Sequence, residues 1–287
     1  MIGEDGAKWK AHEKSSFIVE NKFWANNHVH VLKTKKELLD IYLREYLNET
    51  DLTVEYITGL TVKKLNQNIK VPLPPLHIQE KIVNEIENLE LFEKDSKDKI
   101  KGYTQDINLM INSLETNKKV FISEISENLD NKRKPVTAGN RTNGMYPYYG
   151  ASGIVDYVDD YLLDDIVLLI SEDGANLKSR VTPIAFTASG KIWVNNHAHI
   201  LKFNDIYTHK LVELYLNRID LSPYITGQAQ PKLNQKNLNQ IQIPLPLLQD
   251  QQQIVKQIEE IENKIQNIEK ELETIPTKKE EILKKYL

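Results

Sequence analysis

The chain contains no cysteine and no long apolar run, and both absences narrow what it can be. Without cysteine, disulfide bonds and cysteine-ligated zinc sites are excluded outright. No apolar stretch approaches the roughly 20 residues that a membrane-spanning helix needs. The amino-terminal MIGEDGAKWK also lacks the basic and then apolar pattern of a signal peptide. We therefore expect a cytoplasmic protein.

Neither sign of charge is in large excess, because the formal net charge is only −4 over 287 residues. Affinity for nucleic acid would therefore have to come from local basic patches. The length suits two modest domains of roughly 100–200 residues each. A hydrophobic content of 40% and a charged content of 27% are ordinary for a globular protein.

The chain repeats itself, with blocks recurring in one order at an offset of 168 to 172 residues. The matched blocks are Ile2–Lys10 with Ile170–Lys178, Trp24–Lys33 with Trp193–Lys202, Tyr56–Gly59 with Tyr224–Gly227, Lys64–Gln67 with Lys232–Gln235, and Val71–Leu76 with Ile243–Leu248. The region from about Lys119 to Leu169 has no counterpart in the first copy. Met1 aligns with Leu169, so the first copy is expected to start partway through a domain. It also has four fewer residues between its KLNQ and its PLP.

Each copy ends in a long segment with the 4–3 apolar spacing of a coiled coil. The first seam is Ile82, Ile86, Leu89, Glu93, Ser96, Ile100, Tyr103, Ile107, Met110 and Leu114; the second is Ile254, Ile258, Ile261, Ile265, Ile268, Leu272, Ile275, Lys279, Ile282 and Tyr286. We expect the two helices to pack on each other as an antiparallel pair, with a dimeric coiled coil between chains as the alternative. Pro276 predicts a kink or a break late in the second helix.

Ahead of each helix the pattern is mixed, which indicates small α+β units in a pseudo-twofold repeat. YLLDDIVLLIS is expected to be a strand and LVELYLNRI a helix. The alternation around Ser189–Gly190 predicts a β-hairpin.

The second copy resembles the DNA-specificity subunit of type I restriction-modification systems. The resemblance depends on Tyr146–Val158, Ile170–Ala175, Trp193–Lys202, Thr226–Val255 and the helix that follows. It implies target-recognition domains that each read half of a bipartite DNA site, separated by two long helices. The expected organisation is an incomplete recognition domain at 1–74, a helix at 75–117, a second recognition domain at 118–246 and a helix at 247–287.

The resemblance implies a non-catalytic subunit with double-stranded DNA, methyltransferase (modification) subunits and a restriction/translocase subunit as partners. It binds no cofactor itself, because adenosylmethionine, ATP and magnesium belong to those partners. The first copy has TGLTVKKLN where the second has TGQAQPKLN, so its reading of a half-site is in question. The alternative is a docking, competing or complementing fragment that acts through its coiled coil, and self-association stays open.

Candidate DNA contacts are basic, amide and aromatic side chains, since cations neutralise phosphates and arginine and glutamine bond base edges. They are Lys132, Arg133, Lys134, Arg141, Tyr149, Lys178, Arg180, Gln228 and Gln230, with Lys8 and Lys10 in the first copy. For each, the alternative is a solvated charge or a packed ring. Packing is favoured for the tyrosines Tyr146, Tyr148 and Tyr149, because the bases of a duplex are not free to stack on them.

The doubled Asn-Asn-His-x-His phrase places two histidines on one face of a strand. Zinc needs three or four ligands, and no acidic cluster stands nearby in sequence, so a structural hairpin with His and Asn bonded to backbone is favoured. Methyltransferase and Walker A motifs do not occur. Glu20-Asn21-Lys22 resembles the end of a nuclease motif but has no acidic partner before it.

Overall fold

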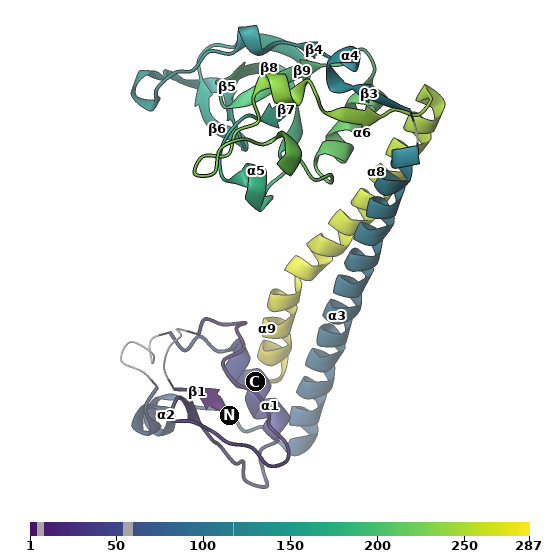
Figure 1. The fold of residues 1–287 in the computed structure, drawn as a ribbon. Coiled ribbons are helices and arrows are strands. Elements are labelled where there is room, and N and C mark those ends of the chain that lie inside the picture. The colour runs from purple at the N-terminus through teal and green to yellow at the C-terminus, as the bar shows by residue number, and fades with distance from the viewer. Residues whose placement is uncertain (5–8, 54–59, 117) are drawn as a thin grey trace. The chain divides into compact units, whose positions relative to one another are not determined.

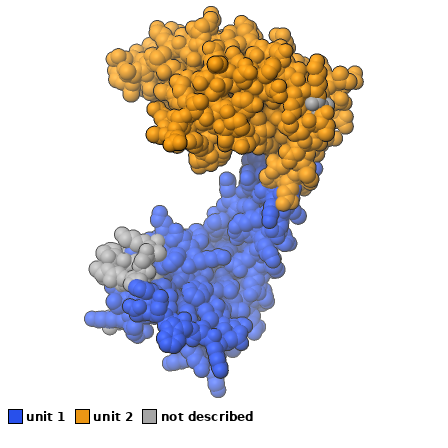
Figure 2. Space-filling view, in the orientation of Figure 1, with its two compact units in different colours: residues 1–102, 264–287 blue, residues 103–263 orange. Residues whose placement is uncertain are grey.

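The computed structural model describes all residues of the chain except 5–8, 54–59 and 117, together with the side chain of Gln67. It divides into two compact units, which Figure 2 colours separately. Unit 1 comprises residues 1–102 and 264–287, and unit 2 comprises residues 103–263. No helix in the described part of the chain is long and apolar enough to cross a membrane.

Unit 2 is built on a six-stranded sheet with the strand order β4-β9-β7-β8-β5-β6. All neighbouring strands are antiparallel except β5 and β8, which are parallel. A separate antiparallel pair, β3 with β10, joins the two ends of the unit. The strands are β3 (Lys119–Phe121), β4 (Glu127–Asn128), β5 (Asn143–Gly150), β6 (Gly153–Val158), β7 (Leu163–Ser171), β8 (Ala185–Val194), β9 (Ala198–Lys202) and β10 (Gln242–Pro244).

The core of unit 2 lies on the central strands, because their apolar runs are long enough to be buried on both faces. Its buried side chains are Val167, Leu169, Ala188, Ile192, Val194, Ala198 and Ile200. Helix α6 (Ile206–Leu216) covers part of β8, and the side chain of Asp205 caps its first turn (Figure 1). The shorter helices are η2 (Leu114–Thr116), α4 (Ile122–Ile125), η3 (Asp130–Lys132), η4 (Ala138–Asn140), α5 (Asn176–Ser179), η5 (Ser222–Tyr224) and α7 (Gln235–Leu238).

Unit 1 repeats the centre of that sheet in reduced form. Strand β1 (Ile2–Gly3) pairs antiparallel with β2 (Val29–His30), and Ile2 is opposite His30 as Ile170 is opposite His199 in unit 2. An isolated bridge from Ile2 to Ser16 matches the pairing of Ile170 with Ala185. The duplication predicted from sequence is therefore preserved down to the register.

A second repeated feature joins each helix to this sheet. The side-chain oxygen of Asn217 accepts hydrogen bonds from the backbone of Ile184 (2.9 Å) and Ala185 (3.0 Å). That of Asn48 accepts one from the backbone of Ser16 at 2.8 Å. Asn48 lies in α1 (Asp40–Glu49), the counterpart of α6. The sequence Tyr-Leu-Asn recurs at 46–48 and 215–217, and its asparagine makes these bonds in both units.

Two long helices, α3 (Leu76–Ser113) and α8 (Leu248–Glu273), each contribute to both units. Each begins with a buried glutamine whose amide nitrogen donates to a proline carbonyl at 2.8 Å. Gln79 donates to Pro74 and Gln251 to Pro246. These side-chain hydrogen bonds tie the start of each helix to the proline that precedes it.

In unit 1, α3 packs antiparallel against α9 (Ile275–Tyr286). Glu85 meets Lys285 at 2.9 Å, whereas Glu90, further along α3, meets the earlier Lys279 at 3.3 Å. Ile82 and Ile86 are fully buried in the cluster that this packing forms. Mixed α/β units with long antiparallel helices are thus confirmed, and Ser96, a polar member of the predicted seam, is also buried.

Pro276 separates the last two helices as predicted. Helix α8 ends at Glu273 and α9 begins at Ile275, with the proline in the first turn of α9. A proline is tolerated there because the first backbone N–H groups of a helix have no partner within the helix. Unit 1 also contains α2 (Val62–Asn68), capped by the Thr61 side chain.

The predicted hairpin at Ser189–Gly190 is wrong. Strand β8 runs through both residues and pairs with β7 without interruption, with Asp165 opposite Gly190. Gly190 has a φ of +77°, so it bends the strand and does not reverse it. A strict alternation of apolar and polar residues is compatible with one bent strand as well as with two short strands.

The two KLNQ segments are not structurally equivalent, which corrects the alignment. In unit 2 the backbone of Leu233 donates to Glu172, and in unit 1 the same bond joins Leu60 to Glu4 at the same 2.7 Å. Leu60, and not Leu65, is therefore the counterpart of Leu233. The offset is 169 at Asn48 and 173 at Leu60. The four-residue difference therefore falls between these two positions and not after KLNQ.

Candidate nucleic-acid interface

The doubled Asn-Asn-His-x-His phrase forms a turn held by asparagine. The side-chain oxygen of Asn195 accepts from the backbone of His197 at 2.8 Å, and Asn26 accepts from His28 at 3.0 Å. The asparagine side chains bond backbone as expected, but the predicted hairpin is wrong, because in unit 2 the phrase links β8 to β9, which lie on either side of β7. Among the described residues, no group of three or more His, Cys, Asp or Glu side chains could hold a metal ion.

His199 is fully buried at the end of the sheet and lies between two acceptors. Its Nδ1 lies 2.6 Å from a carboxylate oxygen of Asp130, and its Nε2 lies 2.7 Å from the carbonyl oxygen of Leu233. Both ring nitrogens therefore face hydrogen-bond acceptors. The residue thereby joins three segments that are distant in sequence.

Arg133 completes this network of charges. Its guanidinium bonds Glu172 and donates to the carbonyl oxygen of Ala198 at 3.2 Å, while Lys232 approaches Glu172 at 3.0 Å. Burial by itself raises the pKa of Asp130 and Glu172. Hydrogen bonds from His199 to Asp130, and from Arg133 and Lys232 to Glu172, outweigh it, so that both pKa values are lowered. The Arg133 side chain is therefore engaged within the protein.

Arg180 is also engaged within unit 2. It follows α5 with a φ of +53°, and its guanidinium donates to the carbonyl oxygens of Leu216 (3.2 Å) and Ile219 (2.8 Å). These carbonyls lie at the end of α6, where a helix leaves acceptors without partners and favours a cation. Burial lowers the pKa of the guanidinium. Arg180 therefore fixes the loop after α5 to the end of α6.

Arg141 and Lys134 lie over aromatic rings on the β5 side of the sheet. The Arg141 guanidinium is 4.4 Å from the centre of the Tyr148 ring and forms an ion pair with Asp156 at 3.0 Å. The Lys134 ammonium is 5.6 Å from the centre of the Trp193 ring. Lys134 is exposed, whereas Arg141 is partly buried and also donates to the carbonyl oxygen of Val136 at 3.1 Å.

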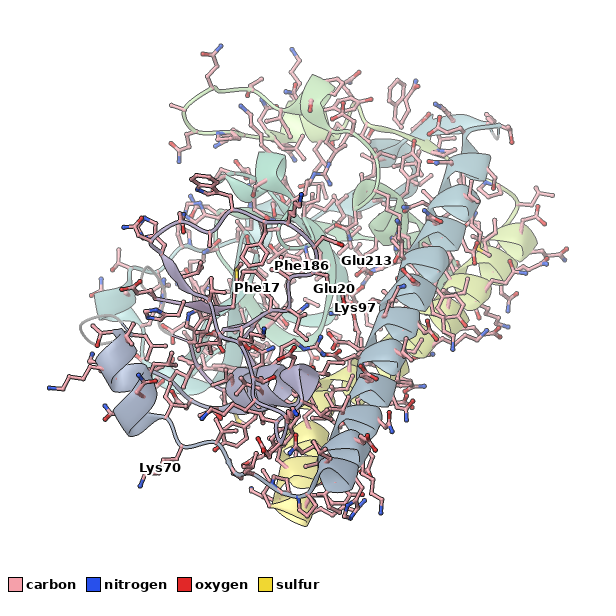
Figure 3. All side chains as sticks on the ribbon, turned by 90° about the horizontal axis from the view of Figure 1, so that it is seen from below. Phe17, Glu20, Lys70, Lys97, Phe186 and Glu213 are labelled. Atoms are coloured by element: carbon pink, nitrogen blue, oxygen red, sulfur yellow. The ribbon has the colours of Figure 1, made fainter. Side chains whose placement is uncertain are left out.

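The tyrosines pack, as predicted. Tyr148 is buried and its hydroxyl accepts from the backbone of Val136 at 2.9 Å. Tyr149 is half-buried and stacks on Phe186 with 6.1 Å between ring centres, and burial raises the pKa of its hydroxyl. Phe186 and Glu213, both of unit 2, are labelled in Figure 3.

Four of the predicted residues have exposed side chains, on the short helices η3 and α5 and on one loop beside this network. They form what we term the recognition rim: Lys132, Lys178, Gln228 and Gln230. Lys178 lies in α5, and its ammonium is 3.4 Å from the carbonyl oxygen of Gly227. Arg133 and Lys232, adjacent in sequence to the rim, both bind Glu172. Cations and amides from three segments are thus gathered at one end of the sheet.

The loop that carries the two glutamines is closed by its own backbone. Thr226 and Lys232 exchange hydrogen bonds of 2.8 and 2.7 Å, and the backbone of Gly174 donates to Pro231 at 3.1 Å. Gly227 has a φ of +80°, and a Cβ atom there would lie 2.3 Å from the carbonyl oxygen of Gln230. Only glycine fits this turn.

In the first copy, Lys8 lies outside the described residues, and Lys10 is exposed. His12 occupies the place of Arg180, with a similar φ of +70°, and pairs with Glu49 of α1. The sequence analysis did not identify Asp130, Glu172 and Lys232, the charged residues of the network that positions Arg133. Asp130 has a local partner in Arg133, and Glu172 and Lys232 lie in repeated blocks, but the bonds of Glu172 to Arg133 and Lys232 join segments that are distant in sequence.

The family model for the type I restriction modification DNA specificity domain matches residues 8–102 and 115–277. This chain belongs to that family. The match covers most of both copies of the repeat, most of α3 and all of α8, which agrees with the resemblance inferred from sequence.

Individual relatives agree with the family assignment. A Haemophilus influenzae protein named as a type I restriction enzyme specificity subunit is 37% identical over 136 residues, which is 47% of this chain. The match spans about a third (34%) of that relative's length. It is thus a likeness to part of a longer protein.

A solved structure shows the same fold. It is reported as the structural basis of complex assembly and conformational transition of the type I R-M system and contains a chain that matches with a TM-score of 0.54. That match has 15% identity over 85% of this chain and 70% of that one. The S subunit from M. genitalium gives a TM-score of 0.49 at 16% identity, over 88% of this chain and 73% of that one.

Proposed function

We propose that this chain is a DNA sequence-recognition subunit of a type I restriction-modification complex. The recognition rim carries the proposal, because it gathers exposed lysines and glutamines on short helices and a loop beside a buried charge network. Lysine neutralises phosphates without regard to sequence, and glutamine can bond the N6 and N7 edge of adenine in the major groove. Unit 2 would thus read one half of a bipartite target.

The remaining predicted residues fall into two groups in this proposal. Arg133 and Arg180 are positioning residues, since their guanidiniums are committed to carboxylates and carbonyls of the protein. Arg141 and Lys134 present charge beside aromatic rings and would contact phosphates at the edge of the interface. Lys10 would do the same in the first copy, if that copy reads DNA.

Catalysis would reside in the partners. The long helices would dock modification subunits, which bring adenosylmethionine and methylate adenine. A restriction subunit would bring ATP and magnesium. The chain would direct both activities to the target and perform neither.

The decisive experiment is a methylation map. The chain is expressed with its cognate modification subunit in a host that lacks such systems, and modified adenines are located genome-wide. We expect a bipartite motif with a fixed gap. Co-purification of the partner without new methylation would overturn the recognition role.

Variants of the rim sharpen this test. Gln228→Ala and Gln230→Ala should relax the motif at one or two adjacent positions of one half-site, since each good bidentate contact discriminates by about 1–3 kcal/mol. Gln240→Ala is the matched control, because Gln240 is exposed in unit 2 but lies just before β10, outside the rim. An unchanged motif in both rim variants would remove the glutamines from readout.

A second candidate function is that of a docking or complementing fragment that does not itself read a half-site through unit 1. The observation in its favour is the exposed apolar face of unit 1, where Trp24 is 96% exposed. Gel filtration of the purified chain distinguishes a monomer from a complementing dimer.

A further inference from the structure

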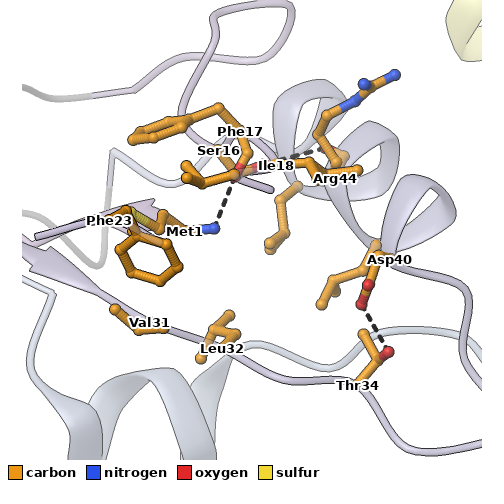
Figure 4. A pocket seen from close by; sticks show the side chains of 13 residues that line it. Met1, Ser16, Phe17, Ile18, Phe23, Val31, Leu32, Thr34, Asp40 and Arg44 are labelled. Atoms are coloured by element: carbon orange, nitrogen blue, oxygen red, sulfur yellow. Dashed lines mark hydrogen bonds between the residues drawn. The ribbon is translucent and has the colours of Figure 1, made fainter. Parts of the chain in front are cut away.

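The pocket of about 130 Å³ in unit 1 has mostly apolar walls, to which Phe17 and Phe23 contribute (Figure 4). The Met1 amino group donates there to the carbonyl oxygen of Phe17 at 2.7 Å. The Thr34 hydroxyl donates to the carboxylate of Asp40 at 2.6 Å. These polar groups are thus engaged within unit 1, whereas one exposed side chain beside the recognition rim of unit 2 is not fully used.

His197 is that side chain, and it lies in the turn between β8 and β9. Its Nδ1 lies 2.9 Å from both carboxylate oxygens of Asp173, and its side chain is 49% exposed. No described residue forms a hydrogen bond with its Nε2. The other histidine of the phrase, His199, differs because both of its ring nitrogens face acceptors inside the protein. His197 therefore has one nitrogen oriented by the protein and one that is available to a ligand.

The turn that carries His197 is held by the three segments that carry the recognition rim. The backbone of Glu172 donates to the carbonyl oxygen of His197 at 2.8 Å. Arg133 donates to the carbonyl oxygen of the following residue at 3.2 Å. Asp173 forms an isolated antiparallel bridge with Lys232, in the loop that carries the two glutamines. The ring therefore lies among the rim residues, and the same framework fixes its orientation.

The carboxylate of Asp173 limits what His197 can bind. A hydrogen bond to a carboxylate favours a proton on Nδ1, and in the neutral ring Nε2 is then an acceptor. Phosphate oxygens are acceptors as well, so they do not match this nitrogen. In the major groove, the groups that donate are the exocyclic amino groups N6 of adenine and N4 of cytosine. The lysines of the rim would supply the phosphate contacts that this nitrogen does not make.

We propose that His197 is a specificity-determining residue of unit 2, which accepts a hydrogen bond from the exocyclic amino group of an adenine or a cytosine. Asp173 is a positioning residue, because it acts through the orientation and the tautomer of the ring. The inference rests on the proposed role in DNA recognition and adds a base contact to it. The base that His197 reads differs from those read by Gln228 and Gln230, which lie on another loop.

The first test compares methylation maps of variants expressed with the cognate modification subunit. His197→Ala should relax the motif at one position that Gln228→Ala and Gln230→Ala leave unchanged. Asp173→Ala should relax the same position more weakly, whereas Asp173→Asn should keep it, because an amide oxygen can still accept from Nδ1. Asn204→Ala is the control, since Asn204 is exposed at the opposite end of β9.

The second test identifies the group that His197 reads. Once the motif is known, duplexes are made in which the base at that position lacks its amino group. Purine replaces adenine, or 2-pyrimidinone replaces cytosine. Loss of the amino group should weaken binding by the unsubstituted complex about three- to tenfold more than binding by the His197→Ala complex, which is the effect of one neutral hydrogen bond.

The contrary outcomes each overturn the assignment. A uniform loss of affinity across sequences in His197→Ala, with a lower salt dependence, would make His197 a phosphate contact. An equal effect of the missing amino group on both complexes would show that His197 does not bind that group. An unchanged motif in His197→Ala would overturn this inference alone. An unsubstituted complex that yields no motif would overturn the role in DNA recognition as well.

Discussion

Asp130 and His199 are 69 residues apart in the sequence, and their side chains meet at 2.6 Å inside unit 2. The contact attaches the turn before β5 to the centre of the sheet. Through Arg133 and Glu172 it also reaches the loops of the recognition rim. Stability of the unit and placement of the rim therefore depend on the same buried group.

Removing one partner of this pair should be costly. Asp130→Ala removes the acceptor of the buried His199 ring and the ion-pair partner of Arg133, and breaking a buried ion pair in this way costs about 3–5 kcal/mol. Urea unfolding followed by Trp193 fluorescence, with Trp9 and Trp24 replaced by phenylalanine, measures the loss. Asp173→Ala is the control, because its partner His197 is 49% exposed and such pairs contribute under about 1 kcal/mol. Equal losses would show that the buried contacts of Asp130 contribute no more than the exposed pair of Asp173.

The same carboxylates make unit 2 sensitive to acid. The pKa values of Asp130 and Glu172 are lower in the folded protein than their ordinary values of 3.8 and 4.5. Their contribution is therefore complete above the unfolded pKa and is lost as the pH falls through the folded one. We expect the free energy of unfolding to decrease below about pH 5. Asp130→Asn should flatten that decrease, and an unchanged slope would exclude Asp130 as its source.

His209 predicts a separate step at higher pH. It is buried beside Thr187, Glu213 and Phe203, and burial lowers its pKa below 6.5. The unfolded chain then binds the proton more readily, so stability should fall as the pH drops through about 6.5. A His209→Gln variant should lack this step while keeping the one at lower pH. Unfolding titrations from pH 8 to pH 5 test it.

Arg180 and Lys178 separate positioning from contact. Arg180→Ala should destabilise unit 2 by about 2–3 kcal/mol, because two carbonyls at the end of α6 lose a charged donor. Lys178→Ala should leave stability within about 0.5 kcal/mol. It should reduce the salt dependence of binding to non-specific duplex by about 0.9 in log–log slope, the value for one phosphate. Salt titrations of duplex binding by both variants test this assignment. A stability loss in Lys178→Ala would reverse it.

Local patterns were enough to predict the elements that depend on local rules. The repeat found in the sequence recurs in the structure, where Ile2 is opposite His30 as Ile170 is opposite His199, and Pro276 marked a helix boundary because proline cannot continue a helix. Alternation alone could not distinguish a hairpin from one strand bent at Gly190. Short identities such as KLNQ misled because a change of loop length shifted them. The engagement of Arg133 and Arg180 depends on partners up to 65 residues away, which residue type alone does not reveal.

The loop that carries Gln228 and Gln230 gives a last prediction, because two glycines with similar backbone angles differ only in their surroundings. Gly227 has a φ of +80° and faces backbone at 2.3 Å, whereas Gly190 has a φ of +77° and faces open space. Gly190→Ala should therefore cost only the left-handed conformation, about 1–2 kcal/mol. Gly227→Ala cannot be accommodated without moving Gln230. It should abolish motif-specific methylation while the protein stays folded, because the loop is a surface turn outside the core. If the two variants lose stability and methylation equally, the shape of the loop does not set the specificity.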